Sequence, residues 1–171
     1  MLPSGNDAAF VLAKHFGKFL FAKKEYTERH KTTIRSFEFD NHNSYVKYFL
    51  KEMNEQASQL KMSSTNWDSP HGLGNKENLT TVNDMLKLQA AAVKIKLLKE
   101  IMQTKVYSCI SMCEDENGEL VKSRKYTWIF NNRLLGVNGI VGMKTGWTPS
   151  AGHSLAVNFD KDGHNYVIMT I

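Results

Sequence analysis

A Lys-Thr-Gly triplet, Lys144 to Gly146, lies within an apolar run of the kind that forms β-strands. A lysine on a strand can place a cation beside a reacting carbonyl or a substrate carboxylate, and a threonine hydroxyl can hydrogen-bond that carboxylate. A glycine permits a substrate backbone to approach closely, and the N–H of the next residue, Trp147, can face a developing oxyanion. This set suits acyl transfer, although a three-letter string also arises by chance.

A second triplet, Ser4-Gly5-Asn6, opens a run of apolar residues at helical spacing. In an enzyme, the serine hydroxyl could relay a proton and the asparagine amide could hold a peptide group of the substrate. The same residue types are those that helix N-termini prefer. An ordinary helix cap is therefore the alternative interpretation of this triplet.

The text around the two triplets resembles one known family. The order Ser-x-Asn and then Lys-Thr-Gly resembles the second and third active-site motifs of serine penicillin-binding proteins. The segments "MNEQASQLKM", "SPHGL" and "NNRLLGVNGIVGMKTGWTPSAGHSLAV" are similar to the low-molecular-mass D-alanyl-D-alanine carboxypeptidases, the S11 peptidases. The resemblance covers nearly the whole chain, so we expect one partial domain over residues 1–171 with an insertion at 18–43.

This resemblance implies a fold and a chemistry. The fold is α+β and β-lactamase/transpeptidase-like, with a helical subdomain and an antiparallel sheet, incomplete here at both ends. The chemistry is serine-type hydrolysis of the terminal D-Ala of peptidoglycan stem peptides through an acyl-enzyme, and penicillins acylate the same serine. The implied partner is a D-Ala-D-Ala-terminated peptide or a β-lactam. No cofactor, metal or nucleic acid is expected.

The roles of the family's site residues can be carried onto this sequence. By resemblance, Ser4 relays a proton, Asn6 binds the substrate amide and Lys144 supplies the positive charge. The resemblance also implies a substrate-binding wall along the strand, made of Thr145, Gly146, Trp147 and Thr148. His71 and Gly72 match a family loop that we interpret as structural.

The family's first motif, Ser-x-x-Lys, supplies the nucleophile and its activating lysine and precedes Ser-x-Asn. Only three residues precede Ser4, so we expect this motif to be absent from the chain. Two later strings fit its spacing, Ser44 with Lys47 and Ser58 with Lys61, and we interpret both as surface polar residues. The sequence predicts a family domain that is inactive in this form. A non-catalytic relative that binds peptide or glycan is the alternative.

Apolar spacing predicts three helices, over residues 4–21, over 44–62 and after Thr81, with a polar loop at 63–81. Residues 81–84 resemble a capping box in which Asp84 replaces the usual Glu or Gln. The helix pattern of the first segment breaks at Lys23. The expected buried faces comprise Ala9, Leu12, Ala13, Phe16, Phe19 and Leu20 in the first helix, Val46, Phe49, Leu50, Met53, Ala57 and Leu60 in the second, and Met85, Leu88, Ala92, Ile95, Leu98 and Met102 in the third.

The pattern changes to strands after Thr104. A hairpin is expected with its turn at Asn117-Gly118, then a loop at 131–139, a strand over 140–148 that carries the Lys-Thr-Gly triplet, and a strand pair that turns at Asp162-Gly163. The final apolar run needs a cover, so we expect Ile168 and Ile171 to be exposed and the isolated chain to be poorly soluble.

Composition adds few constraints. The net charge is +5, and a basic, aromatic-containing run at 14–35 could bind nucleic acid or a membrane surface. A solvated surface is the interpretation we favour, because Phe16 and Phe19 are assigned to a helix core. Cys109 and Cys113 lack redox or zinc spacing and are expected to be free thiols. The opening residues predict no signal peptide, no apolar run predicts a membrane span, and neither compartment nor oligomeric state is predicted.

Overall fold

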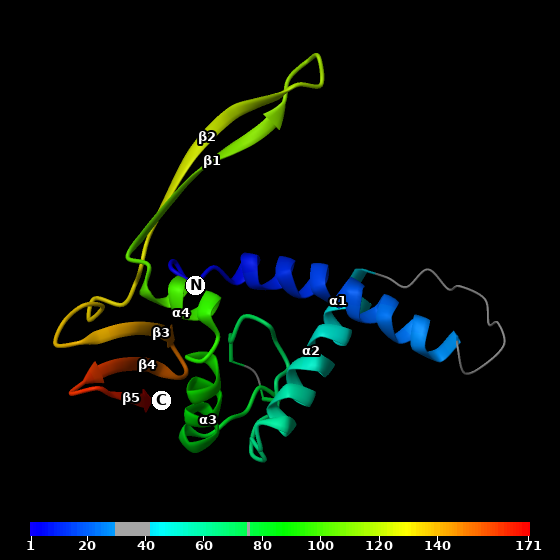
Figure 1. Ribbon diagram of the computed structural model, residues 1–171. Coiled ribbons are helices and arrows are strands. Elements are labelled where there is room, and N and C mark those ends of the chain that lie inside the picture. Colours follow the sequence, from blue (N-terminus) through cyan, green and yellow to red (C-terminus); the bar gives the residue numbers. More distant parts are fainter. Residues whose placement is uncertain (30–41, 75) are drawn as a thin grey trace. The chain divides into compact units, whose positions relative to one another are not determined.

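The computed structural model describes residues 1–29, 42–74 and 76–171, and four helices precede five strands in this part of the chain (Figure 1). The strands form two sheets, one of two strands and one of three. This order confirms the predicted α+β class. The elements are α1 (Asn6–Arg29), α2 (His42–Gln59), α3 (Val82–Ala92), α4 (Lys96–Gln103), β1 (Val106–Glu114), β2 (Leu120–Ile129), β3 (Ile140–Thr148), β4 (Gly152–Lys161) and β5 (His164–Thr170).

The chain divides into two compact units. The sheet unit consists of Met1–Ser4, Gln89–Trp147 and Gly152–Ile171, and the helical unit of Gly5–Leu88 and Thr148–Ala151. The chain therefore passes between the two units four times. Among the described residues, no helix has the length and apolar character that a membrane crossing requires.

In the helical unit, α1 and α2 approach each other at Gly17. A Cβ at this position would collide with the backbone carbonyl of Tyr45, so only glycine allows the two helices to come this close. Ala13, one turn earlier, is fully buried. The ring of Phe21 packs near Tyr45 and Tyr48, with ring centroids 5.7 and 5.2 Å away.

The prediction for the buried face of α1 is partly wrong. Leu12, Phe16 and Phe19 are 53%, 49% and 60% exposed, although Ala13 is buried as expected. The contact side follows the small residues Ala13 and Gly17, because a close backbone approach needs small side chains. The rings of Phe16 and Phe19 instead contact each other across 6.5 Å on the exposed side.

The helix also continues past the predicted break at Lys23, to Arg29. The first part of the predicted insertion at 18–43 is therefore helical. Residues 30–41 of that insertion lie outside the described residues. α2 then begins at His42, close to the expected start.

The start of α3 confirms half of the capping box. The backbone N–H of Asp84 donates to Thr81 Oγ1 over 3.2 Å. The Asp84 carboxylate does not reciprocate, since it accepts bonds from Ser64 N (2.8 Å), Thr65 Oγ1 (2.9 Å) and Lys87 Nζ (2.8 Å). The bond from Lys87 lowers the pKa of the buried Asp84, against a burial effect that would raise it. Asp84 thus ties the segment after α2 to α3.

The predicted third helix is in fact two helices. The end of α3 tightens, with the N–H groups of Lys94 and Ile95 donating to carbonyls three residues back, and α4 starts at Lys96. Ile95, predicted to be buried, is 52% exposed because it lies at this break. Met102 in α4 is buried, as expected.

Gln89 connects α3 to the three-stranded sheet. Its side chain is buried, and Nε2 donates to the carbonyls of Val157 on β4 (2.5 Å) and Ile168 on β5 (3.3 Å). This one amide therefore bonds to two neighbouring strands, and it fixes the end of α3 against the sheet that carries the Lys-Thr-Gly triplet.

The strands follow the predicted pattern. β1 and β2 are antiparallel, from Val106 opposite Ile129 to Glu114 opposite Leu120, and β4 and β5 are antiparallel across Asp162-Gly163. Both residues of that turn have positive φ (52° and 76°), as a two-residue hairpin turn requires. The sequence analysis expected one antiparallel sheet, but β1 and β2 form a sheet of their own, separate from β3, β4 and β5.

Two further predictions are confirmed, one on exposed isoleucines near the end of the chain and one on free cysteine thiols. Ile168 and Ile171 are 46% and 57% exposed. Cys109 and Cys113 are both free thiols on β1.

Replacing Gln89 with methionine should lower the free energy of unfolding by about 1–3 kcal/mol, because the strand carbonyls lose their donor. Urea unfolding followed by circular dichroism measures this loss. Gln103, exposed on α4, provides the matched control, and Gln103→Met should change stability little. Equal losses in the two variants would contradict the role assigned to Gln89.

Candidate active site

β3 carries the Lys-Thr-Gly triplet and spans the residues that the sequence predicts for it. Two residues with positive φ come directly before the triplet, Gly142 at 137° and Met143 at 125°. A Cβ at Gly142 would collide with the carbonyl of Met102, and the side chain of Met143 is buried. Packing at these two positions therefore holds the backbone in a strained conformation directly before Lys144.

The structure brings together two of the predicted catalytic residues that lie far apart in the sequence. Lys144 Nζ donates a hydrogen bond of 2.7 Å to Ser4 Oγ across a separation of 140 residues. The amine also donates to the carbonyl of Thr145. Ser4 has a φ of 56° and is held in place by its neighbour Leu2, which is buried and accepts a bond from Asn131 N at 3.2 Å.

The electrostatics of this pair suit proton transfer. Burial lowers the pKa of the Lys144 amine below the ordinary lysine value, because the charged form loses hydration. The amine therefore gives up a proton more readily than an exposed lysine. Since Ser4 Oγ accepts from Lys144, its own hydroxyl proton is free for a third group. The pair can pass a proton from the amine through the hydroxyl.

Gly146 faces a neighbouring side chain of the sheet. A Cβ at Gly146 would lie 2.5 Å from Ser154 Oγ on β4 and 3.9 Å from Ser154 Cβ. The sequence analysis explained this glycine by the approach of a substrate. The structure gives a second reason, because the Ser154 hydroxyl already occupies the space.

The other members of the predicted wall differ in exposure and contacts. Trp147 is 60% exposed, and its ring lies 6.3 Å from that of His153. Thr148 has a local role, since its Oγ1 accepts from Ala151 N (3.1 Å) in the turn before β4. Asn6, the first residue of α1, belongs to the helical unit, as does Thr148. Ser4 and residues 144–147 belong to the sheet unit.

Of the two alternative Ser-x-x-Lys strings, Ser58 with Lys61 does not form a catalytic pair. Ser58 Oγ donates to the carbonyl of Asn54 on its own helix (3.0 Å). Lys61 lies beyond the end of α2 with a φ of 59°, so the two residues do not share a helical turn. Ser44 lies in α2, and its side chain is outside the described residues.

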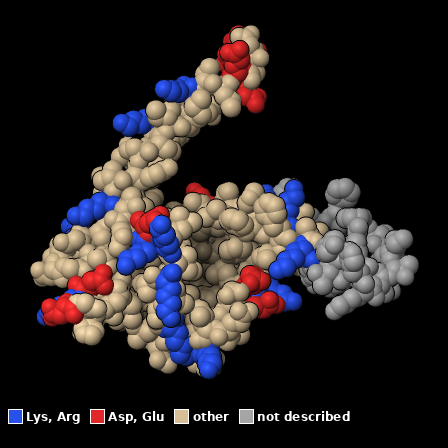
Figure 2. Space-filling view, viewed as in Figure 1, with Lys and Arg blue, Asp and Glu red and all other residues tan. Residues whose placement is uncertain are grey.

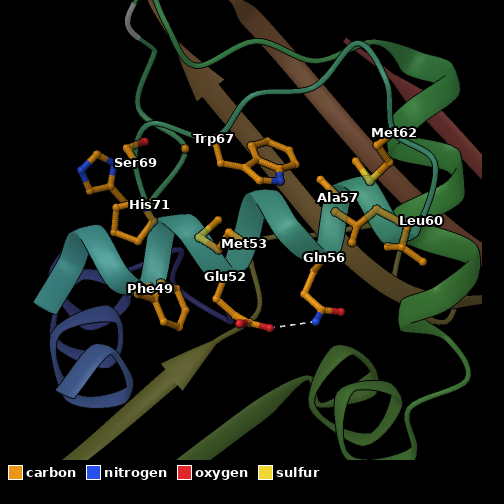
Figure 3. Close-up of a pocket in the computed structure, with 13 residues that line it drawn as sticks. Phe49, Glu52, Met53, Gln56, Ala57, Leu60, Met62, Trp67, Ser69 and His71 are labelled. Carbon is orange, nitrogen blue, oxygen red and sulfur yellow. Dashed lines mark hydrogen bonds between the residues drawn. The ribbon is translucent and has the colours of Figure 1, made fainter. Parts of the chain in front are cut away.

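His71 agrees with the structural role expected for its loop. Its Nδ1 accepts from Leu73 N over 3.2 Å, which fixes the ring to its own loop. His71 also lines a hollow of about 470 Å³ in the helical unit, which the sequence analysis did not predict (Figure 3). None of the predicted catalytic residues lines this hollow. Its walls are Phe49, Glu52, Met53, Gln56, Ala57, Leu60, Met62, Trp67, Ser69, Pro70, His71, Gly72 and Leu88.

The sequence contained a signal for this hollow. Phe49, Met53 and Ala57 follow helical spacing on α2 and line the hollow. The sequence analysis assigned them to the buried face of the helix. Figure 3 shows the indole of Trp67 on the same side of α2 as Ala57, with Glu52 and Gln56 on another side, joined by a hydrogen bond of 2.8 Å. Spacing identifies an apolar face, but it does not tell whether that face is filled.

A family model described as D-alanyl-D-alanine carboxypeptidase, peptidase S11, matches residues 40–171. The chain belongs to this family. The curated D-alanyl-D-alanine carboxypeptidase of Streptomyces sp. strain K15 is 28% identical over 167 residues, which are 98% of this chain and 50% of that protein. The protein DacA of Haemophilus influenzae is 23% identical over 156 residues, 91% of this chain and 30% of that protein.

Solved structures confirm the family fold. The crystal structure of the Streptomyces K15 DD-transpeptidase has a TM-score of 0.75 and 30% identity, and the match covers 100% of this chain and 56% of that one. A D-alanyl-D-alanine carboxypeptidase of Mycobacterium tuberculosis, with a TM-score of 0.57 and 23% identity over 72% of this chain and 44% of that one, agrees in fold. This carboxypeptidase-family chain spans about half the length of the curated K15 relative.

Burial of Lys144 gives a testable pH dependence of stability. Its pKa is lower in the folded state, so the unfolded state binds more protons just below the ordinary lysine value of about 10.4. The free energy of unfolding should therefore gain a rising component with pH in that window. Lys144→Met should remove this component, as measured by urea unfolding between about pH 8 and 10.

The control for that measurement is Lys96→Met, since the side chain of Lys96 is 92% exposed. It should retain the wild-type slope. A Lys144→Met variant with an unchanged slope would contradict the burial effect.

The two explanations of Gly146 can be separated by a pair of variants. Gly146→Ala should lower the melting temperature, because the new methyl group meets Ser154 Oγ, and Gly146→Ala combined with Ser154→Ala should restore it. If Gly146 also admits substrate, the double variant should recover stability without recovering peptide binding. A double variant that stays as unstable as Gly146→Ala would exclude the contact with Ser154 as the cause.

Proposed function

We propose that the sheet unit of this chain forms one wall of an acyl-transfer site for peptides that end in D-Ala-D-Ala, and that β-lactams bind to the same wall. The observation that carries this proposal is the bond between Lys144 Nζ and Ser4 Oγ. It joins a cation of lowered pKa to a hydroxyl with a free proton, within a chain of the D-alanyl-D-alanine carboxypeptidase family.

In this proposal, each residue acts through its own chemistry. The Lys144 ammonium and the Thr145 hydroxyl bind the terminal carboxylate of the peptide. Asn6, in the helical unit, keeps the amide-binding role that the family resemblance implies for it. The backbone N–H of Trp147 faces the oxyanion of the tetrahedral intermediate. The hydroxyl proton of Ser4 moves to the nitrogen of the leaving D-Ala as the C–N bond breaks, and a proton from Lys144 replaces it.

The covalent step also needs a serine nucleophile with an activating lysine. Among the described residues, Ser58 and Lys61 do not form such a pair, as their geometry shows. We therefore propose that the 171-residue chain binds the peptide without forming an acyl-enzyme. The K15 relative is about twice as long as the part matched here, and we propose that a protein of that length hydrolyses or transfers the peptide.

Binding can be measured through the fluorescence of the exposed Trp147, with an acetylated peptide that ends in D-Ala-D-Ala and its C-terminal amide as a matched pair. The wild-type chain should bind the acid about tenfold or more tightly than the amide, because only the acid offers a carboxylate to Lys144. Lys144→Met should bind both peptides equally weakly. Ser4→Ala should keep the preference for the acid, because a relay hydroxyl acts in the reaction rather than in binding.

Two outcomes would contradict the proposal. Equal binding of acid and amide by the wild-type chain would remove the carboxylate role of Lys144. A stable mass increase after incubation with a penicillin, located on Ser4, would make Ser4 a nucleophile instead of a relay.

A further inference from the structure

The two edges of the β1–β2 hairpin differ in charge. Residues 106–113 of β1 read "VYSCISMC" and carry no charge, and Glu114 alone ends the strand. β2, in contrast, carries Lys122, Arg124 and Lys125. Natural sheets protect exposed edges with charged residues, lysine above all. By this rule, the edge of β2 is protected and that of β1 is open to pairing.

The hairpin forms a two-stranded sheet, so within the described part of the chain the outer edge of β1 pairs with no strand (Figure 1). Large apolar side chains of β1 lie at this surface. About half of the surface of each is exposed, and they are Val106, Tyr107, Ile110 and Met112. β1 therefore offers free backbone N–H and C=O groups between apolar side chains.

The hairpin is ordered by its own contacts. The Trp128 ring lies 6.1 Å from Tyr107 and 5.7 Å from Tyr126, at interplanar angles of 16° and 7°. At the irregularity between Ile110 and Met112, Ser111 Oγ donates to the carbonyl of Arg124 and accepts from its N–H. At this irregularity Ser111 is thus hydrogen-bonded to β2, and β1 keeps its strand conformation although no further strand pairs with it in the described part of the chain.

The charges that flank β1 select a second copy of this chain as the partner. Lys105 precedes the strand and Glu114 ends it, and within the described ranges neither lies within 4 Å of an opposite charge. Two antiparallel copies of β1 place Lys105 of each beside the Glu114 end of the other. A parallel arrangement would place like charges together. Figure 2 shows acidic residues at the hairpin tip and basic residues along the hairpin.

We propose that β1 pairs with β1 of a second copy around a two-fold axis, giving a four-stranded sheet in which the two copies of β1 are central and the two copies of β2 are the edges. Such an interface is isologous, since the same surface serves on both copies. Backbone hydrogen bonds between the two copies of β1 supply the affinity, and the flanking charges favour the antiparallel orientation. This association does not depend on the acyl-transfer proposal.

The test is a charge exchange, followed by sedimentation equilibrium of the 171-residue chain in reducing buffer, which prevents crosslinks through Cys109 or Cys113. The wild-type chain should dimerise. Glu114→Lys and Lys105→Glu should each weaken the dimer about tenfold, because two attractions become two repulsions. The combined variant should restore the wild-type dissociation constant. Glu100→Lys, the same charge change at an exposed position of α4 outside the hairpin, is the matched control and should behave as wild type.

Hydrogen exchange supplies a readout that does not depend on charge. Amides of residues 106–114 should exchange more slowly as the protein concentration rises, while those of 120–129 should not change. A monomer at every concentration, a dimer unaffected by Glu114→Lys, or protection confined to β2 would overturn the proposal. So would β1 protection that appears in a monomer only when a D-Ala-D-Ala peptide is added, since the edge would then hold peptide.

Discussion

The partly buried amine of Lys144 is the constraint on which the sheet unit depends. An ammonium that loses hydration needs hydrogen-bond acceptors, and the chain provides Ser4 Oγ and the carbonyl of Thr145. To bring Ser4 to this position, the segment before it docks through Leu2, and the backbone before Lys144 adopts positive φ. Packing around Met143 and the bonds of Gln89 then hold the strand and the sheet in place. Keeping a cation partly out of water in this way is costly for folding.

The sequence predicted most of the sheet unit. Strand patterns are short-range, and the Asp162-Gly163 and Asn117-Gly118 turns fix where each strand pair reverses, so the limits of β3, the hairpin and the last strand pair could be read from the text. The meeting of Ser4 and Lys144 could not be derived from spacing, because 140 residues separate them. It was expected only through the resemblance to the family, which the comparisons confirm.

The helices show where local patterns fail. The apolar spacing of α1 includes Phe16 as well as Ala13, and the contact that decides between two faces is the approach of α2 at Gly17. Likewise, Asp84 has the sequence of a capping residue, but its carboxylate bonds to Ser64 and Thr65, some twenty residues away. In both cases a long-range contact overrides a local preference, and a local pattern contains no information about that contact.

The four crossings between the units have a genetic consequence. Gly5–Leu88 is one uninterrupted stretch of the helical unit, and the chain belongs to the sheet unit before and after it. Recombination at two points could therefore replace nearly all of the helical unit. Ser4 and Lys144 both lie outside that stretch. Such an exchange would leave the hydrogen-bonded Ser4–Lys144 pair unchanged, while Asn6 and everything up to Leu88 would be replaced in one event.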